Sequence, residues 1–312
     1  MKQIVVLSGK GGTGKTTVCA ALAHLAGAHH SLVLADADVD AANLELVLAP
    51  EQQEQHDFWS GHIAAIDPQA CTACGRCAEV CRFASIIAPS ATGALSATGT
   101  LSAGRDAYRV DEVACEGCAA CHYQCPADAI RMVEQQAGRW FRSDTRFGPL
   151  FHAHLFAGRE NSGKLVSQVK QQANLWAIDH DADWLVVDGP PGIGCPVISA
   201  SAGADLALLV VEPTVSGVHD LERVLATVEH FRVPASVVVN KADLNPRRTR
   251  EIAGFCAQQD VPVVGQIPYD PIVTEAMVHG MPVSEYADGA VAQALEGVWA
   301  RTRETLAASA DR

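Results

Sequence analysis

The feature that most constrains the fold is a glycine-rich loop near the start of the chain, Gly9-Lys10-Gly11-Gly12-Thr13-Gly14-Lys15-Thr16. An apolar run at Gln3–Ser8 precedes the loop, and an alanine-rich run from about Lys15 to Ala28 follows it. The loop matches the pattern G-x-x-x-x-G-K-S/T, whose glycines let backbone N–H groups turn toward phosphate oxygens at the start of a helix. The sequence therefore predicts a buried strand, a phosphate-binding loop and a helix, in that order.

Short β-type runs recur along the chain, with helical patterns between them. Strands are expected at Leu32–Ala35, Trp184–Val187, Leu206–Val211, Ser236–Val239 and Val263–Ile267, and helices at about 216–230, 246–259 and 291–307. Continuously apolar strands are typical of a sheet that is covered on both faces. Their alternation with helices predicts an α/β fold with a doubly wound, mostly parallel sheet.

Eight of the 11 cysteines form an internal repeat in the middle of the chain. Each half reads C-x₂-C-x₂-C-x₃-C, and the second half follows the first after 44 residues, from Cys71 to Cys115. This is the bacterial ferredoxin spacing for two [4Fe–4S] clusters, in which the fourth cysteine of each run ligates the other cluster. The expected ligand sets are Cys71, Cys74, Cys77 and Cys125 for cluster one, and Cys81, Cys115, Cys118 and Cys121 for cluster two. Each fourth cysteine is expected at the start of a short helix.

Structural zinc is the main alternative for these cysteines. Zinc sites typically pair two C-x₂₋₄-C knuckles from either side of a loop, which four cysteines in one short run do not provide. The repeat predicts an inserted α+β ferredoxin-like domain at 58–146, inside a P-loop domain made of 1–57 and 147–312. Within the insert, Ala88–Gly104 is expected to be a loop or hairpin that joins the two halves.

Carboxylates follow two of the expected strands. Asp36 and Asp38 come directly after the Leu32–Ala35 run, and Asp188 begins the turn Asp188-Gly189-Pro190-Pro191-Gly192. Beside a phosphate loop, such carboxylates can hold Mg²⁺ and orient a water molecule.

Lys10 adds a second lysine early in the loop, and the loop then resembles the deviant Walker A motif of the MinD/ParA and nitrogenase iron protein family. The resemblance implies an ATPase with ATP and Mg²⁺ as cofactors. It implies that Lys10 contacts nucleotide across a dimer, like an arginine finger, and that Asp38 positions the attacking water. Lys15 completes the expected catalytic set, because it can reach the β- and γ-phosphates.

The same resemblance extends to the rest of the nucleotide site. Thr16, Asp36 and Asp188 are expected around Mg²⁺, and Asp188 and Gly192 form the expected switch II, with the Gly192 N–H sensing the γ-phosphate. The expected nucleotide-binding residues are Gly11, Gly12, Thr13, Gly14, Lys15, Thr16, Thr17, Asn240 and Pro268. Asn240-Lys241-Ala242-Asp243 is also the guanine-reading pattern of GTPases, so ATP is favoured and GTP stays open.

Charge and hydropathy exclude several classes of protein. The 312 residues contain 23 Lys and Arg against 36 Asp and Glu, a net charge of −13, which disfavours a nucleic-acid-binding surface. No apolar run approaches the roughly 20 residues of a membrane span. The apolar start is too short for a signal peptide. We therefore expect a soluble, cytoplasmic protein with reduced cysteines and no nucleic-acid or membrane partner.

Together, the motifs predict an ATP-driven dimer switch coupled to electron transfer through the two clusters to a redox or iron–sulfur partner. The dimer is expected between two copies of the chain or with a related ATPase. Two alternatives stay open: an ATP-dependent iron–sulfur cluster carrier, and a MinD/ParA-like spatial organiser. The polar, mixed-charge C-terminal segment disfavours the membrane-binding organiser.

Three cysteines and two histidine pairs lie outside these motifs. Cys19 and Cys256 are expected to be small core residues, and burial is also expected for Cys195, because no second cysteine supports a bridging cluster. The pairs His29-His30 and His152-x-His154 have no carboxylate or cysteine at helical ligand spacing. They are expected to be solvated or strand-surface residues.

Overall fold

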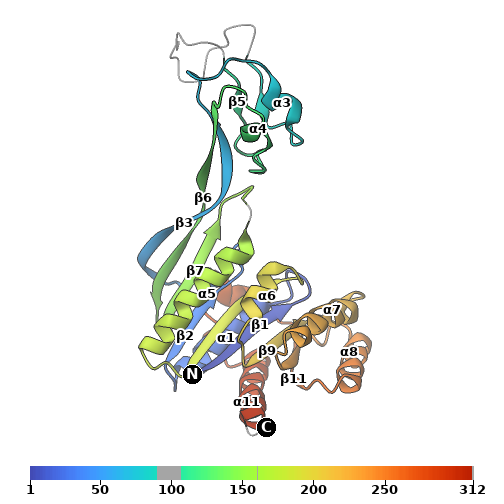
Figure 1. Cartoon of the computed structure of the whole chain (residues 1–312). Coiled ribbons are helices and arrows are strands. Elements are labelled where there is room, and N and C mark those ends of the chain that lie inside the picture. Colours follow the sequence, from blue (N-terminus) through green and yellow to red (C-terminus); the bar gives the residue numbers. More distant parts are fainter. Residues whose placement is uncertain (90–106, 160, 311–312) are drawn as a thin grey trace. The chain divides into compact units, whose positions relative to one another are not determined.

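The computed structural model describes residues 1–89, 107–159 and 161–310 (Figure 1). Most of the loop or hairpin expected at Ala88–Gly104 lies outside these described residues. The chain forms two compact units. Unit 1 comprises Met1–His56, Arg139–Leu155 and Ser162–Arg312, and unit 2 comprises Asp57–Gly138 and Phe156–Asn161.

A sheet with the strand order β11-β10-β9-β1-β8-β2-β7-β6-β3 organises the described residues of unit 1. The strands are β1 (Lys2–Ser8), β2 (Leu32–Asp36), β3 (Glu51–Ile66), β6 (Ile130–Thr145), β7 (Gly148–Leu155), β8 (Trp184–Pro191), β9 (Leu206–Val211), β10 (Ala235–Asn240) and β11 (Val263–Ile267). All the pairings from β11 to β7 are parallel. The mostly parallel α/β sheet expected from the sequence is therefore confirmed.

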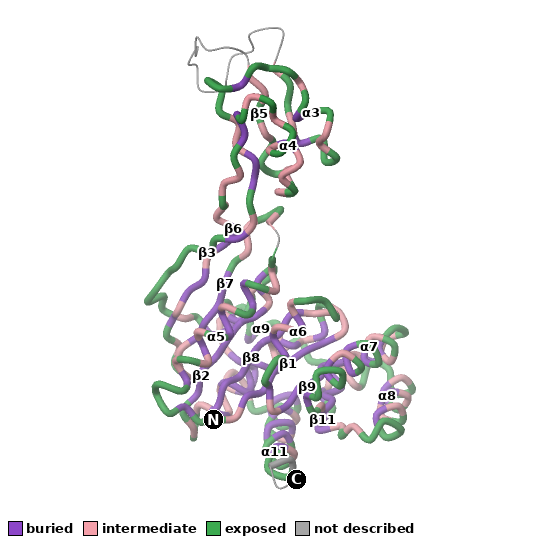
Figure 2. The backbone as a smooth tube through the Cα atoms, in the orientation of Figure 1, coloured by how far each residue is buried: buried purple, intermediate pink, exposed green. Residues whose placement is uncertain are grey.

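Helices cover the central strands. They are α1 (Lys15–Gly27), α2 (Leu44–Leu48), α5 (Ser162–Asp179), α6 (Cys195–Ser201), α7 (Gly217–His230), α8 (Pro246–Gln258), α9 (Ile272–Val278), α10 (Val283–Tyr286) and α11 (Ala290–Ala310). Figure 2 shows that β1 and β8 are buried along most of their length. Val6 of β1, Leu22 of α1 and Leu295 of α11 belong to one core cluster. Burial on both faces is the reason why these strands are continuously apolar.

The sequence patterns missed four of the longer elements: β3, β6, β7 and α5. The first seven residues of β3 are all exposed and polar, so they lack the alternation that identifies a strand. In contrast, α5 buries Leu165, Val166, Val169 and Ala173 at helical spacing, which is a signal that could have been found. Because β3 and β6 each include residues of both units, the boundaries expected for an inserted domain stay a prediction.

Unit 2 repeats its backbone conformation as well as its cysteines. It contains the short helices α3 (Arg76–Val80) and α4 (Ala120–Tyr123) and the antiparallel pair β4 (Ile86–Ile87) and β5 (Arg109–Val110). Left-handed residues recur at equivalent positions of the two halves, as the pairs Ala73 and Gly117, Gly75 and Ala119, and Ala84 and Asp128. Each half therefore folds around its cysteines in the same way.

Among the described residues, no helix combines the length and the apolar character that a membrane crossing requires.

Candidate functional site

The phosphate loop lies between β1 and α1, as expected. Gly12 and Gly14 have φ angles of +77° and +93°, in the left-handed region that glycine adopts without strain. A Cβ atom on Gly14 would lie 2.3 Å from the Asn240 side-chain nitrogen, whereas one on Gly11 would meet no atom within 4 Å. Helix α1 begins at Lys15 without a side-chain cap, so its first N–H groups can serve an anion.

The sheet brings the expected carboxylates to this loop. Asp36 at the end of β2 pairs in register with Asp188 of β8, and Asp188 pairs with Val6 of β1, two residues before the end of that strand. Asp36, Asp188 and Lys15 are all buried. Neighbouring parallel strands therefore hold two carboxylates side by side, and the buried Lys15 is the first residue of α1, which follows the phosphate loop.

Asp36 uses its carboxylate to organise the loop after β2. One oxygen accepts the N–H of Asp38 at 3.1 Å, and the other accepts the N–H groups of Asn43 and Leu44 at 3.1 and 3.0 Å. Burial, followed by the charge of Asp188, raises the pKa of Asp36 well above its ordinary value. These bonds give Asp36 a structural task, and its place in the magnesium shell stays a prediction.

Asp188 is placed differently, because neither of its buried carboxylate oxygens has a well-aligned hydrogen-bond partner among the described residues. Burial raises its pKa to about 7, with a smaller contribution from Asp38, although Thr16 and Lys15 act in the opposite direction. Two adjacent buried carboxylates require a cation or a proton. Asp188, which has no well-aligned partner and lies beside Thr16, therefore fits a Mg²⁺ ion, which prefers hard oxygen ligands.

Asp38 lies in the loop that Asp36 holds. It is partly buried, and burial raises its pKa while Lys15 lowers it. Asp38 thus interacts electrostatically with both Lys15 and Asp188, so the structure brings the expected catalytic carboxylate to the phosphate loop.

Two residues expected to sense the nucleotide have partners within the chain. The ammonium group of Lys10 donates to the Thr214 hydroxyl at 3.1 Å and lies 3.6 Å from Glu212. The N–H of Gly192 donates to the Ser8 carbonyl oxygen at 2.9 Å. Each residue must therefore exchange its partner before it can contact a phosphate group.

The residues expected to read the base do not all line the same cavity. The Asn240 amide donates to the carbonyl oxygen of Thr13 at 2.8 Å and so ties β10 to the phosphate loop. Asp243, the acidic residue of the GTPase-like pattern, accepts the Tyr269 N–H at 2.7 Å. Pro268 lines a cavity together with Asp243, but Asn240 is not part of its wall.

The cysteines of unit 2 line two cavities, and each cavity has four. The first contains Cys71, Cys74, Cys77 and Cys125, and the second contains Cys81, Cys115, Cys118 and Cys121. These are the two sets expected from the spacing, with one cysteine exchanged between the halves. All eight are free cysteines, and they range from buried to exposed.

One expectation for these cysteines was wrong, because the fourth cysteine of each run does not begin a helix. Cys77 and Cys121, the third cysteines, lie within α3 and α4, and Cys81 and Cys125 follow the ends of these helices. Gly75 adopts a left-handed conformation directly before α3. The helix therefore begins beside the third cysteine, Cys77, and not at the fourth. In the second half, Pro126 disfavours helical backbone at Cys125.

Several sulfur atoms accept hydrogen bonds. The Ala73 N–H lies 3.4 Å from the Cys71 sulfur, and the Ala129 N–H lies 3.3 Å from the Cys125 sulfur. Burial acts to raise the pKa of the Cys81 thiol, but contacts with Ser85 and nearby backbone N–H groups outweigh it and lower the pKa. Donors of this kind favour the thiolate, the form that ligates metals.

The remaining cysteines differ in exposure. Cys19 and Cys256 are buried core residues, as expected. Cys195 is exposed, so the expected burial was wrong. It is the first residue of α6. A Cβ atom added to Gly163 of α5 would lie 3.2 Å from the Cβ atom of Cys195.

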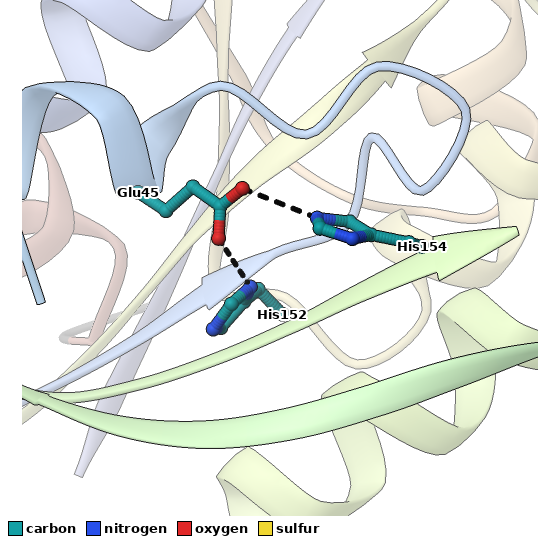
Figure 3. A group of neighbouring side chains, drawn as sticks. All are labelled: Glu45, His152 and His154. Atoms are coloured by element: carbon teal, nitrogen blue, oxygen red, sulfur yellow. Dashed lines mark hydrogen bonds and ion pairs between the residues drawn. The ribbon is translucent and has the colours of Figure 1, made fainter. Parts of the chain in front are cut away.

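The expectation of a solvated or strand-surface residue was also wrong for His152, whereas His154 is exposed on strand β7, as expected. His152 is buried, and both histidines lie within 3.2 Å of a Glu45 carboxylate oxygen (Figure 3). No sequence signal could have found this group, because α2 and β7 are far apart along the chain and only the sheet brings them together.

Comparisons with known proteins agree with this architecture. Residues 4–283 match the family described as "CobQ/CobB/MinD/ParA nucleotide binding domain". An uncharacterized protein of Methanocaldococcus jannaschii is 33% identical over 243 residues, which cover 78% of this chain and 79% of that protein. The iron-sulfur cluster carrier protein of Pyrococcus abyssi is 23% identical over 309 residues, which cover 94% and 82%.

Among solved structures, the septum site-determining protein MinD of Pyrococcus horikoshii, complexed with Mg-ADP, superposes with a TM-score of 0.58. The match covers 99% of this chain and 98% of that chain at 18% sequence identity, so it supports the fold alone.

Proposed function

Because the chain belongs to the CobQ/CobB/MinD/ParA nucleotide-binding family, we propose that it is an ATPase whose dimer switch drives electrons through two [4Fe–4S] clusters to a partner protein. The observation that carries this proposal is the pair of four-cysteine cavities in a chain that also has a complete phosphate loop. Electron transfer suits eight ligands of ferredoxin type, because such clusters are held permanently.

The spacing of the sulfur atoms favours cubane clusters over zinc. Four sulfurs around one zinc ion at about 2.3 Å lie roughly 3.8 Å from one another. Among the described residues, no three cysteine sulfurs lie within 4.8 Å of one another. This arrangement is wider than the one that a single tetrahedral zinc ion requires.

In the nucleotide site, each residue has a proposed task. The buried Lys15 and the N–H groups at the start of α1 bind the phosphates, and Thr16 and Asp188 hold Mg²⁺, which neutralises phosphate charge when bound. Asp38 orients the attacking water. Lys10 leaves Glu212 and Thr214 to contact nucleotide on the second protomer of the dimer, so dimer formation replaces one charged contact by another.

Metal analysis tests the proposal directly. The chain purified anaerobically is expected to hold about eight irons, from two cubanes. Cys74→Ser is expected to lose one cluster, or about half of the iron. Cys195→Ser is the matched control, because Cys195 is exposed but lies in unit 1, outside both cavities, and this variant should keep all its iron. Zinc instead of iron in an iron-replete preparation would overturn the proposal.

A second function is favoured by one comparison. The iron-sulfur cluster carrier protein of Pyrococcus abyssi aligns over 94% of this chain, and this similarity supports a carrier that delivers its clusters rather than retaining them. Mixing the loaded chain with an apo-ferredoxin and ATP distinguishes the two functions. A carrier transfers iron to the acceptor and becomes colourless, whereas an electron-transfer protein keeps its clusters.

A further inference from the structure

A glutamate and two histidines form a compact group in unit 1, apart from the nucleotide and cysteine sites (Figure 3). Glu45 comes from α2, and His152 and His154 come from β7. The two histidines are two residues apart on a strand, so they project from the same face. One carboxylate oxygen and one nitrogen from each ring lie within 4.8 Å of one another.

The contacts of His152 are those of a metal ligand. Its ring is buried, and its Nε2 lies 3.0 Å from the Ser143 hydroxyl. Its Nδ1 lies 3.1 Å from a Glu45 oxygen, yet the two atoms are not aligned as a hydrogen bond, and Nδ1 has no other partner among the described residues. When Nε2 carries the proton and donates to Ser143, Nδ1 directs a lone pair toward a carboxylate. Two electron-rich atoms this close need a proton or a metal ion between them, and only a metal ion can bind the second histidine at the same time.

The rest of the group is held in place. His154 Nε2 lies 3.2 Å from the second Glu45 oxygen, and the Phe141 ring stacks on His152 at 5.1 Å. The Asp36 carboxylate binds the backbone N–H of Leu44, directly before Glu45. Ligands that are positioned by hydrogen bonds and ring packing are typical of metal centres.

We propose that Glu45, His152 and His154 bind one divalent transition-metal ion of the zinc class. Two imidazoles and a carboxylate are a ligand set that zinc accepts, and ligands at about 2.0–2.1 Å around a tetrahedral ion lie roughly 3.3 Å apart. The ring nitrogens of His152 and His154 lie 3.1 and 3.2 Å from the two different oxygens of Glu45, and one ligand atom of each residue lies within 4.8 Å of the others, so the three side chains are close enough to contract around one ion. The side chains of His154 and Glu45 are 47% and 25% exposed, so an ion can enter and keep a water molecule as its fourth ligand.

Zinc binding to variants of the full chain tests the site. The anaerobically purified chain is titrated with Zn²⁺, and bound zinc is counted and examined by zinc-edge X-ray absorption, which separates nitrogen and oxygen ligands from sulfur. Glu45→Gln and His154→Asn are the informative variants, because these side chains are partly exposed and should not disturb folding. His219→Asn is the matched control, since His219 lies near Glu222 on α7 without a third ligand.

The wild type is expected to bind one zinc ion more than either variant, or to bind it at least about tenfold more tightly. The spectral difference between wild type and variant is expected to show only nitrogen and oxygen scattering at about 2.0 Å. Ser143→Ala is expected to weaken binding as well, because it releases the His152 ring. The proposal is overturned if Glu45→Gln binds zinc as the wild type does, or if the difference shows sulfur ligands.

Discussion

At the residue scale, the nucleotide site combines groups that are costly to bury. Asp188 is buried without a well-aligned partner, and Asp36 beside it is satisfied only by backbone N–H groups. Such an arrangement destabilises the chain without ligand and favours the state that binds a cation. The same residues that weaken the fold are therefore those proposed to bind Mg²⁺ and ATP.

Asp38→Ala is expected to retain ATP binding and to lose hydrolysis by about 10²–10⁴-fold, because the phosphate-binding groups lie elsewhere and only the orientation of water is lost. Phosphate release and equilibrium nucleotide binding measure the two effects separately. Asp40→Ala is the control, because Asp40 is exposed two residues away. Normal hydrolysis by Asp38→Ala would refute its catalytic role.

Gly14→Ala is expected to destabilise the nucleotide-free chain by more than about 1–2 kcal/mol, the usual cost of a left-handed alanine. The new methyl group would also meet the Asn240 amide at 2.3 Å, which displaces the tie between β10 and the loop. Gly11→Ala is a matched control, because its Cβ would meet no atom. Thermal unfolding of both variants compares them, and equal stabilities would contradict the steric argument.

At the element scale, α5 and α6 are joined by a buried lysine. The Lys170 ammonium group donates to the carbonyl oxygens of Ala200, at 2.7 Å, and Ala202, at the C-terminal end of α6. Burial lowers its pKa to about 8. The lysine therefore satisfies carbonyl groups that α6 leaves free, at the expense of burying a charge.

This lysine predicts a pH dependence of stability. Because the folded-state pKa is about 8 and the ordinary value is 10.5, the unfolded chain binds more protons between these values. The free energy of unfolding is therefore expected to rise with pH across this window, by roughly 1–3 kcal/mol. Lys170→Met should lack this rise, and urea unfolding of both proteins at pH 7.5 and 10 measures the difference. If the free energy of unfolding changes equally with pH in both proteins, the hydrogen bonds of Lys170 cancel the effect of burial on its pKa, and the prediction is wrong.

At the scale of the whole molecule, the chain connects its two units through shared segments. Strands β3 and β6 carry residues of both units. Leu155 donates its N–H to Val39, beside Asp38, and the next residue, Phe156, donates to Ala137 of unit 2. The loop after β2 and a strand of unit 2 are therefore hydrogen-bonded to two adjacent residues of the chain, Leu155 and Phe156.

We expect the nucleotide state to shift the cluster potentials. Allosteric coupling energies are typically about 1–3 kcal/mol, and about 1.4 kcal/mol corresponds to roughly 59 mV for one electron. Redox titration followed by electron paramagnetic resonance, on Asp38→Ala with ADP and then with ATP, is expected to show a shift of several tens of millivolts. If the cluster potentials are identical with ADP and with ATP, the clusters only conduct electrons. ATP would then act on the docking of the partner protein.

The sequence by itself determined the parts of the protein that depend on local spacing. The phosphate loop needs its glycines and lysines within eight residues, and each buried strand needs an unbroken apolar run. Both features can therefore be predicted from the sequence. The grouping of the cysteines in two cavities could also be predicted, because the ferredoxin spacing implies that the fourth cysteine of each run joins the other set.

Only the tertiary structure decided the features that join distant segments. The polar β3 forms a strand because it pairs within the sheet, although its sequence lacks the strand pattern. Lys10 contacts Glu212, and Glu45 meets His152 and His154, through the packing of elements that lie far apart in the sequence. Local patterns report backbone preference and burial, whereas these contacts depend on which strand ends and helices the sheet topology makes neighbours.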